Sequence, residues 1–171
     1  MNEKYTFIDL DGVILDSQER MLEKKEEAGF LNHEDPTEFD NYFKIVDDLV
    51  GEWDYILGEA KPINNSIEII KELEAMKKRI AILTKINTLK EMKLKVEILR
   101  SKQNIYVPII FVPPGIEKHE IVIPNGQILI DDSRRNISGW NNHYGNGILF
   151  NKNIECSTHD TVNSLEFLLK R

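Results

Sequence analysis

Short apolar runs alternate along the chain with longer segments in which apolar residues recur at helical spacing. The first run lies within residues 4–17. It is aromatic and β-branched until it stops at Asp9-Leu10-Asp11-Gly12, as a buried strand entering a turn would. Four further runs of this kind follow, so the pattern predicts five strands. The later four are residues 80–84, 106–112, 127–130 and 147–150.

The segments between these runs predict helices. Asp16, Asn65 and Thr88 each precede a glutamate by three residues, which is typical of a helix start. The helix after Thr88 is expected to turn its apolar residues inward and its lysines toward solvent. A closing helix is expected to start at Ser157 or Thr158. The earlier helices are predicted at residues 16–31, 37–57, 65–76 and 88–99.

Strands that alternate with helices predict an α/β fold, with a Rossmann-like parallel sheet of five strands between two layers of helices. Residues 1–16 and 62–171 are expected to form this three-layer core. Residues 17–61 are expected to form a small helical insert. Because ligands of such sheets bind beyond the carboxyl ends of the strands, the residues that end the strands are the candidates for function.

Acidic residues end two of the predicted strands. Asp9 and Asp11 are two positions apart and should project the same way, and Asp131 and Asp132 follow the fourth strand. Gathered carboxylates repel one another, and a divalent cation that prefers oxygen ligands removes the repulsion. We therefore predict a Mg²⁺ site. Asp132 is expected to be a direct ligand and Asp131 its hydrogen-bonding neighbour, although the reverse assignment stays open.

Composition narrows the class of partner. The chain of 171 residues carries 22 lysines and arginines against 29 acidic residues, a net charge of −7, which opposes binding to a long nucleic acid. No apolar run is long enough to span a membrane. A single cysteine, Cys156, fits a reducing compartment, so we expect a cytoplasmic protein. A small phosphorylated substrate is compatible with the charge, and the choice between monomer and homodimer stays open.

The run Phe7-Ile8-Asp9-Leu10-Asp11-Gly12-Val13 resembles the first motif of the haloacid dehalogenase-like (HAD) phosphatases. The later order of Thr84, a lysine before the fourth strand, and the acidic pair Asp131-Asp132 resembles the other three motifs. The resemblance implies Mg²⁺-dependent hydrolysis of a phosphate monoester.

The resemblance also implies roles for single residues. Asp9 would attack phosphorus and form an aspartyl phosphate. Asp11 would protonate the leaving oxygen, and its main-chain oxygen would be a third metal ligand. Thr84 would bind the phosphoryl group. Lys118 is our choice for the lysine that orients Asp9, with Lys85 as the alternative.

Two features suggest a branch of the family. The insert occupies the place of a C1 cap, and Ile130-Asp131-Asp132-Ser133 followed by Asn136 is similar to the 5′(3′)-deoxyribonucleotidases. A nucleoside monophosphate would then be the substrate. Phe43 and Trp53 could stack on its base, or they could form the core of the cap. The alternatives are a phosphatase of a sugar phosphate or phosphonate and a nucleotide-binding module without catalysis.

Overall fold

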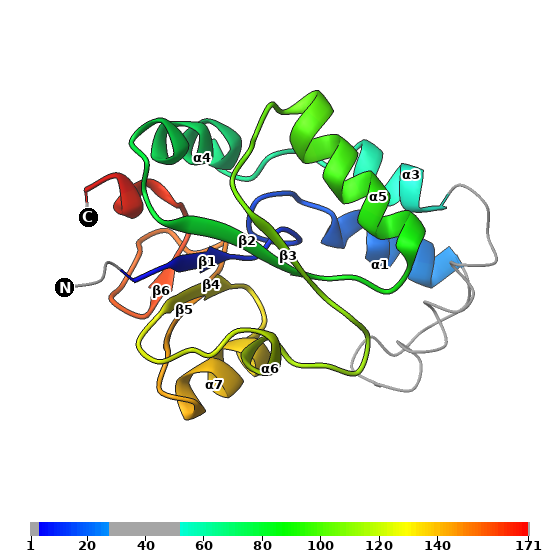
Figure 1. The fold of residues 1–171 in the computed structure, drawn as a ribbon. Helices are drawn as coiled ribbons and strands as arrows, with labels where there is room; N and C mark the ends of the chain where they lie inside the picture. Colours follow the sequence, from blue (N-terminus) through cyan, green and yellow to red (C-terminus); the bar gives the residue numbers. More distant parts are fainter. Residues whose placement is uncertain (1–3, 28–51, 171) are drawn as a thin grey trace.

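The computed structural model describes residues 4–27 and 52–170. Its centre is a sheet in which every strand pair is parallel, as the sequence predicts. The order is β3-β2-β1-β4-β5-β6, so β1 lies in the middle (Figure 1). The strands are β1 Thr6–Ile8, β2 Ile80–Lys85, β3 Ile109–Val112, β4 Ile128–Asp131, β5 Asn146–Phe150 and β6 Thr161–Val162.

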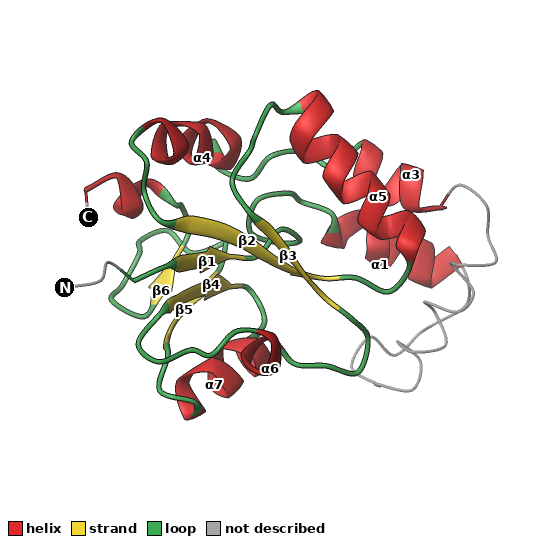
Figure 2. Ribbon diagram, in the orientation of Figure 1, coloured by secondary structure: helices red, strands yellow, loops and turns green. Residues whose placement is uncertain are grey.

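Helices cover both faces of this sheet, which confirms the predicted three layers (Figure 2). Figure 1 shows α6 and α7 below the sheet, and α4 and α5 above it. In the part of the chain described, we find no helix with the length and apolarity to cross a bilayer. The helices are α1 Gln18–Glu27, α3 Glu52–Gly58, α4 Ser66–Ala75, α5 Leu89–Glu97, its π-helical continuation Ile98–Lys102, α6 Lys118–Ile121, α7 Arg134–Asn142 and a 3₁₀ helix Glu166–Lys170.

The central strands send alternate side chains into two separate cores. Ile8 and Ile130 lie in the core under α4 and α5, whereas Phe7 and Leu129 pack with Trp140 of α7 on the other face. This alternation continues past the strand ends, because successive side chains of a strand point to opposite faces. It therefore decides on which side of the sheet the polar residues that directly end the strands emerge, but it does not hold for Asp11, which contacts Lys95 of α5 where the chain turns.

The sheet has six strands, not the five predicted. Thr161 and Val162 pair with Leu149 and Phe150, where we expected a closing helix. The buried residues of this segment are spaced by three, which suits an α-helix but equally suits a short strand followed by a 3₁₀ helix. The segment forms a strand because β5 has a free edge with which it can pair. The backbone amides of Leu149 and Asn151 donate to this segment at 2.9 and 2.8 Å.

The predicted insert is only partly within the described residues. Its ends form α1 and α3, and the Tyr55 hydroxyl of α3 donates to Glu23 of α1 at 2.7 Å. Residues 28–51, with Phe43, lie outside the described residues. The extent of a cap thus stays a prediction.

Replacing Leu129 by alanine should lower the free energy of unfolding by about 3 kcal/mol, because it leaves a cavity in the centre of the sheet. Leu129 is 0% exposed, while Ile123 is 81% exposed and serves as the matched control. Urea denaturation of both variants measures the difference. Equal losses in Leu129→Ala and Ile123→Ala would contradict this packing.

Candidate active site

Three carboxylates meet at the carboxyl edge of the sheet. The amide of Asp9 donates to the carbonyl of Ile130 at 2.9 Å, which ties the end of β1 to the end of β4. One oxygen from each of Asp9, Asp131 and Asp132 lies within 4.8 Å of the others. The structure therefore brings together three of the four acidic residues that we expected at this edge; Asp11, expected to project the same way as Asp9, is not among them.

Lys118 lies between two of these acids. Its Nζ is 2.9 Å from Asp9 Oδ1 and 2.6 Å from Asp131 Oδ2, and the side chain is buried. Asp9 and Asp131 emerge on the same face as α6, where Lys118 begins the helix. Burial lowers the pKa of the Lys118 ammonium, but the two carboxylates outweigh it and the pKa is raised. Lys118 is thus a fixed positive charge beside Asp9.

Asp131 and Asp132 differ in what their oxygens contact. Asp131 is buried and accepts hydrogen bonds from Lys118, from the amide of Ser133 at 2.8 Å and from Asn136 Nδ2 at 3.1 and 3.0 Å. Asp132 is partly exposed, and its Oδ2 accepts from Gln18 Nε2. This arrangement favours Asp132 as a direct metal ligand and Asp131 as the residue behind it.

The crowding of carboxylates shifts their pKa values. Burial raises the pKa of Asp9 to about 8, against the opposing effect of Lys118 and with the repulsion of Asp131 and Asp132 added. Burial and the charge of Asp131 raise the pKa of Asp132 to about 7. The three carboxylates together carry more negative charge than Lys118 balances, and this excess charge is costly in a buried site. Three oxygen donors with this excess charge fit Mg²⁺.

Asp11 does not join the cluster. Ser17 Oγ donates to its Oδ1 at 2.7 Å, and Lys95 Nζ lies 2.6 Å from its Oδ2. Burial raises the pKa of Asp11, but Lys95 and Ser17 outweigh it and the pKa is lowered. Lys95 and Ser17 therefore favour the ionised form of this carboxyl group, while only its main-chain oxygen stays a candidate metal ligand.

The next residue must be glycine for two reasons. Gly12 has a φ of 75°, which other residues rarely adopt. A Cβ atom there would collide with the carboxylate of Asp132. The turn after β1 thus leaves space for the acid that comes from β4.

Of the two residues at the end of β2, only the first points its side chain into the site. The buried Thr84 hydroxyl donates to Asp11 Oδ2 at 3.3 Å and accepts from Lys95 Nζ at 3.2 Å. Lys85 is partly exposed and pairs with Glu117 at 3.0 Å. Because Lys118 and not Lys85 contacts Asp9, this geometry favours Lys118 as the orienting lysine.

Lys95 was missed by the sequence analysis. The prediction that α5 turns its lysines to solvent is wrong for this residue, which is fully buried, while Leu89 is 70% exposed. Lys95 Nζ is 2.7 Å from Glu91 Oε1. Glutamate and lysine four positions apart are most often found on a solvated helix face. The spacing of Glu91 and Lys95 predicts that the two side chains pair. That this face of the helix is buried depends on the strand ends packed against it, which the spacing does not show.

Trp53 is 1% exposed and lies in the core with Ile56 and Leu57 of the same helix. Its ring is therefore part of the packing of α3 in this structure rather than a surface on which a base could stack. Phe43, the other aromatic residue predicted to stack, is outside the described residues.

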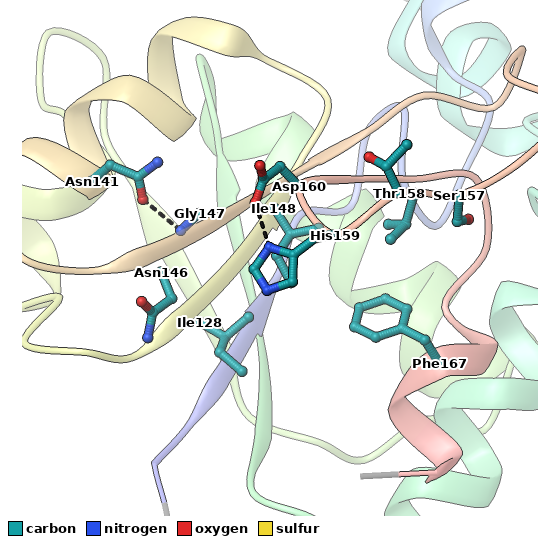
Figure 3. Close-up of a pocket in the computed structure, with 11 residues that line it drawn as sticks. Ile128, Asn141, Asn146, Gly147, Ile148, Ser157, Thr158, His159, Asp160 and Phe167 are labelled. Atoms are coloured by element: carbon teal, nitrogen blue, oxygen red, sulfur yellow. Dashed lines mark hydrogen bonds and ion pairs between the residues drawn. The ribbon is translucent and has the colours of Figure 1, made fainter.

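Two pockets lie at different ends of the sheet, and one of them is next to the acidic cluster. One of about 190 Å³ lies directly beside the cluster and is lined by Gly12, Gln18, Asp132, Arg134 and Lys152, among others. Another, of about 610 Å³, lies at the opposite end of the sheet, where Ile128 and Asn146 begin β4 and β5 (Figure 3). Of these two pockets, the first is therefore the one that includes a member of the acidic cluster, Asp132.

The fold of this chain is similar to the folds of solved HAD-superfamily hydrolases. A haloacid dehalogenase-like hydrolase from Streptococcus pneumoniae has a TM-score of 0.62 and 15% identity, covering 87% of this chain and 85% of that one. A HAD hydrolase from Bacillus subtilis, in a structure bound to magnesium, has a TM-score of 0.63 and 16% identity over 99% and 98% of the two chains. A family IA HAD hydrolase from Entamoeba histolytica has a TM-score of 0.62 and 10% identity over 96% and 94%.

No family model matches the sequence, and no curated protein matches it. The structural likeness thus shows the fold: this chain has the three-layer architecture of HAD-like hydrolases, as its motifs suggested. The neighbours do not single out the deoxyribonucleotidase branch.

Mg²⁺ should bind more tightly as pH rises. The raised pKa values of Asp9 and Asp132 mean that the metal-free folded protein holds protons that the unfolded chain has released, so its stability falls as pH rises toward 8. Mg²⁺ must displace these protons. We expect its apparent Kd to be at least about 10-fold weaker near pH 6 than near pH 8.

Thermal melting across a Mg²⁺ titration measures this dependence. Asp132→Asn should lose most of the stabilisation by Mg²⁺, whereas Asp160→Asn, at an exposed position, should keep it. A Kd independent of pH, or an unchanged shift in Asp132→Asn, would contradict the assignment.

Proposed function

We propose that this protein is a Mg²⁺-dependent phosphomonoesterase that works through an aspartyl phosphate on Asp9. The observation that carries the proposal is the buried Lys118, which bridges Asp9 and Asp131 beside Asp132 at the carboxyl edge of a HAD-like sheet. A nucleophile, a fixed cation and a set of metal ligands are thereby within reach of one phosphoryl group.

Asp9, Asp132 and the main-chain oxygen of Asp11 would hold the cation, with Asp131 supporting them. When bound, Mg²⁺ offsets the repulsion between the Asp9 carboxylate and the phosphoryl oxygens. The other steps of the proposed reaction are carried out by side chains of the protein itself.

Asp9 is oriented for attack by its own contacts. Within the described residues, both the amide of Leu10, at 2.8 Å, and Lys118, at 2.9 Å, bind Oδ1. Oδ2 is left to attack phosphorus. The Thr84 hydroxyl and the backbone amide that follows it, at the end of β2, would bind a phosphoryl oxygen, and the hydroxyl would then turn from Asp11 to the substrate.

The reaction then proceeds in two displacements. Asp9 Oδ2 forms a bond to phosphorus while the bond to the ester oxygen breaks, and Asp11 gives that oxygen a proton that its carboxylate took up when the phosphate dianion bound beside it. Asp11 next takes a proton from a water molecule. The water oxygen bonds to phosphorus, the bond to Asp9 breaks, and inorganic phosphate leaves.

A nucleoside monophosphate is our proposed substrate class. It is supported by the resemblance of the acidic pair and Asn136 to the deoxyribonucleotidases, and by the cationic residues Arg134 and Lys152 of the pocket beside Asp132. The net charge of −7 favours a small substrate over a long nucleic acid.

Asp9→Asn should lower phosphate release by at least about 1,000-fold, because an amide cannot form the phosphoenzyme. Activity of the wild-type protein should vanish on chelation and return with Mg²⁺. A phosphate-release assay over nucleoside monophosphates, sugar phosphates and phosphonates measures both activity and substrate class.

Asp160→Asn is the matched control and should keep full activity. Turnover that survives Asp9→Asn would end the proposal. Nucleotide binding by calorimetry without any phosphate release from the wild-type protein would instead support a binding module.

A further inference from the structure

A second buried ammonium lies on the other face of the sheet from Lys118. Lys95 Nζ is 2.6 Å from Asp11 Oδ2, 2.7 Å from Glu91 Oε1 and 2.7 Å from the carbonyl oxygen of Lys85. We propose that Lys95 is the positioning residue that fixes the Asp11 carboxyl group for proton exchange with the leaving group. This inference rests on the proposed phosphomonoesterase function.

Lys95 is itself held in place. Its side chain is 0% exposed, and Glu91, one turn earlier on α5, is 2% exposed. The second oxygen of Glu91 accepts from the backbone amide of Asn87 at 2.7 Å. A buried ammonium is costly unless it makes its hydrogen bonds. Lys95 makes them to Asp11, to Glu91 and to the carbonyl oxygen of Lys85. The start of α5 therefore anchors Lys95 toward the strand ends.

The three donors to Asp11 come from different segments. Ser17, just before α1, binds Oδ1, while Lys95 of α5 and Thr84 of β2 bind Oδ2. Donors on both oxygens fix the plane of a carboxyl group, which a single donor would leave free to rotate. A carboxylate has about four acceptor positions, so room is left for the oxygen of a leaving group.

The role makes a specific prediction about leaving groups. An alkyl phosphate expels a strongly basic alkoxide and needs the proton of Asp11 as the ester bond breaks. Dinitrophenyl phosphate expels a weakly basic phenolate and does not. Misplacing Asp11 should thus slow the first substrate and spare the second, whereas general damage to the fold would slow both.

Lys95→Met removes the ammonium and keeps much of the volume. We expect kcat/KM for an alkyl phosphate to fall by about 100-fold, and that for dinitrophenyl phosphate by less than about 3-fold. The ratio kcat/KM reports the steps up to formation of the phosphoenzyme, so the later attack of water does not enter. Lys93→Met, at an exposed position of the same helix, should change neither value.

Removing Lys95 alone leaves Glu91 buried without its counter-charge, so the variant could fail to fold. The double variant Glu91→Gln with Lys95→Met leaves the net charge of the cluster unchanged and should show the same selective loss, with melting curves to confirm that it is folded. Equal losses on the two esters, from an active wild-type protein, overturn this inference alone. A wild-type protein that cleaves neither ester overturns the proposed function, and this inference with it.

Discussion

The edge of the sheet depends on neutralising carboxylates that are buried together. Two lysines do this, one on each face: Lys118 bridges Asp9 and Asp131, and Lys95 bridges Asp11 and Glu91. Removing one member of such a buried pair leaves an uncompensated charge, which is far more costly than the pair itself. The lysines do not cancel all of the negative charge, and this remaining charge, together with burial, keeps the pKa values of Asp9 and Asp132 raised. That remaining negative charge is what makes this edge suited to a divalent cation.

The division of labour between the two lysines follows from the alternation of side chains in β-strands. Asp9 and Asp131 emerge on the face of Phe7 and Leu129, where α6 supplies Lys118. Thr84, two residues after Ile82, emerges on the opposite face, where α5 supplies Lys95. Asp9 and Asp11, for which we propose the roles of nucleophile and proton-exchanging acid, are thus contacted from opposite sides of the sheet, by helices that come from distant parts of the chain.

The same reasoning explains what the sequence could and could not predict. A strand that ends in acidic residues can be located from its pattern, so Asp9, Asp131 and Asp132 were predicted to meet. Lys95 was not, because a charged pair spaced by four looks the same on a buried helix face as on a solvated one. The strand Thr161–Val162 was missed for a related reason, since its pairing depends on a free edge of β5 that local spacing does not reveal.

The residues that follow β4 hold the side chain of Asp131 in place. Asn136 donates to both oxygens of Asp131, and Ser133 accepts from the amide of Asn136 at 3.4 Å as the first turn of α7 begins. Both residues therefore serve the acid behind the metal ligand. Under the proposed function, choice among phosphate esters would depend on other side chains that can contact the leaving group, and Arg134, which lines the pocket beside Asp132, is our candidate.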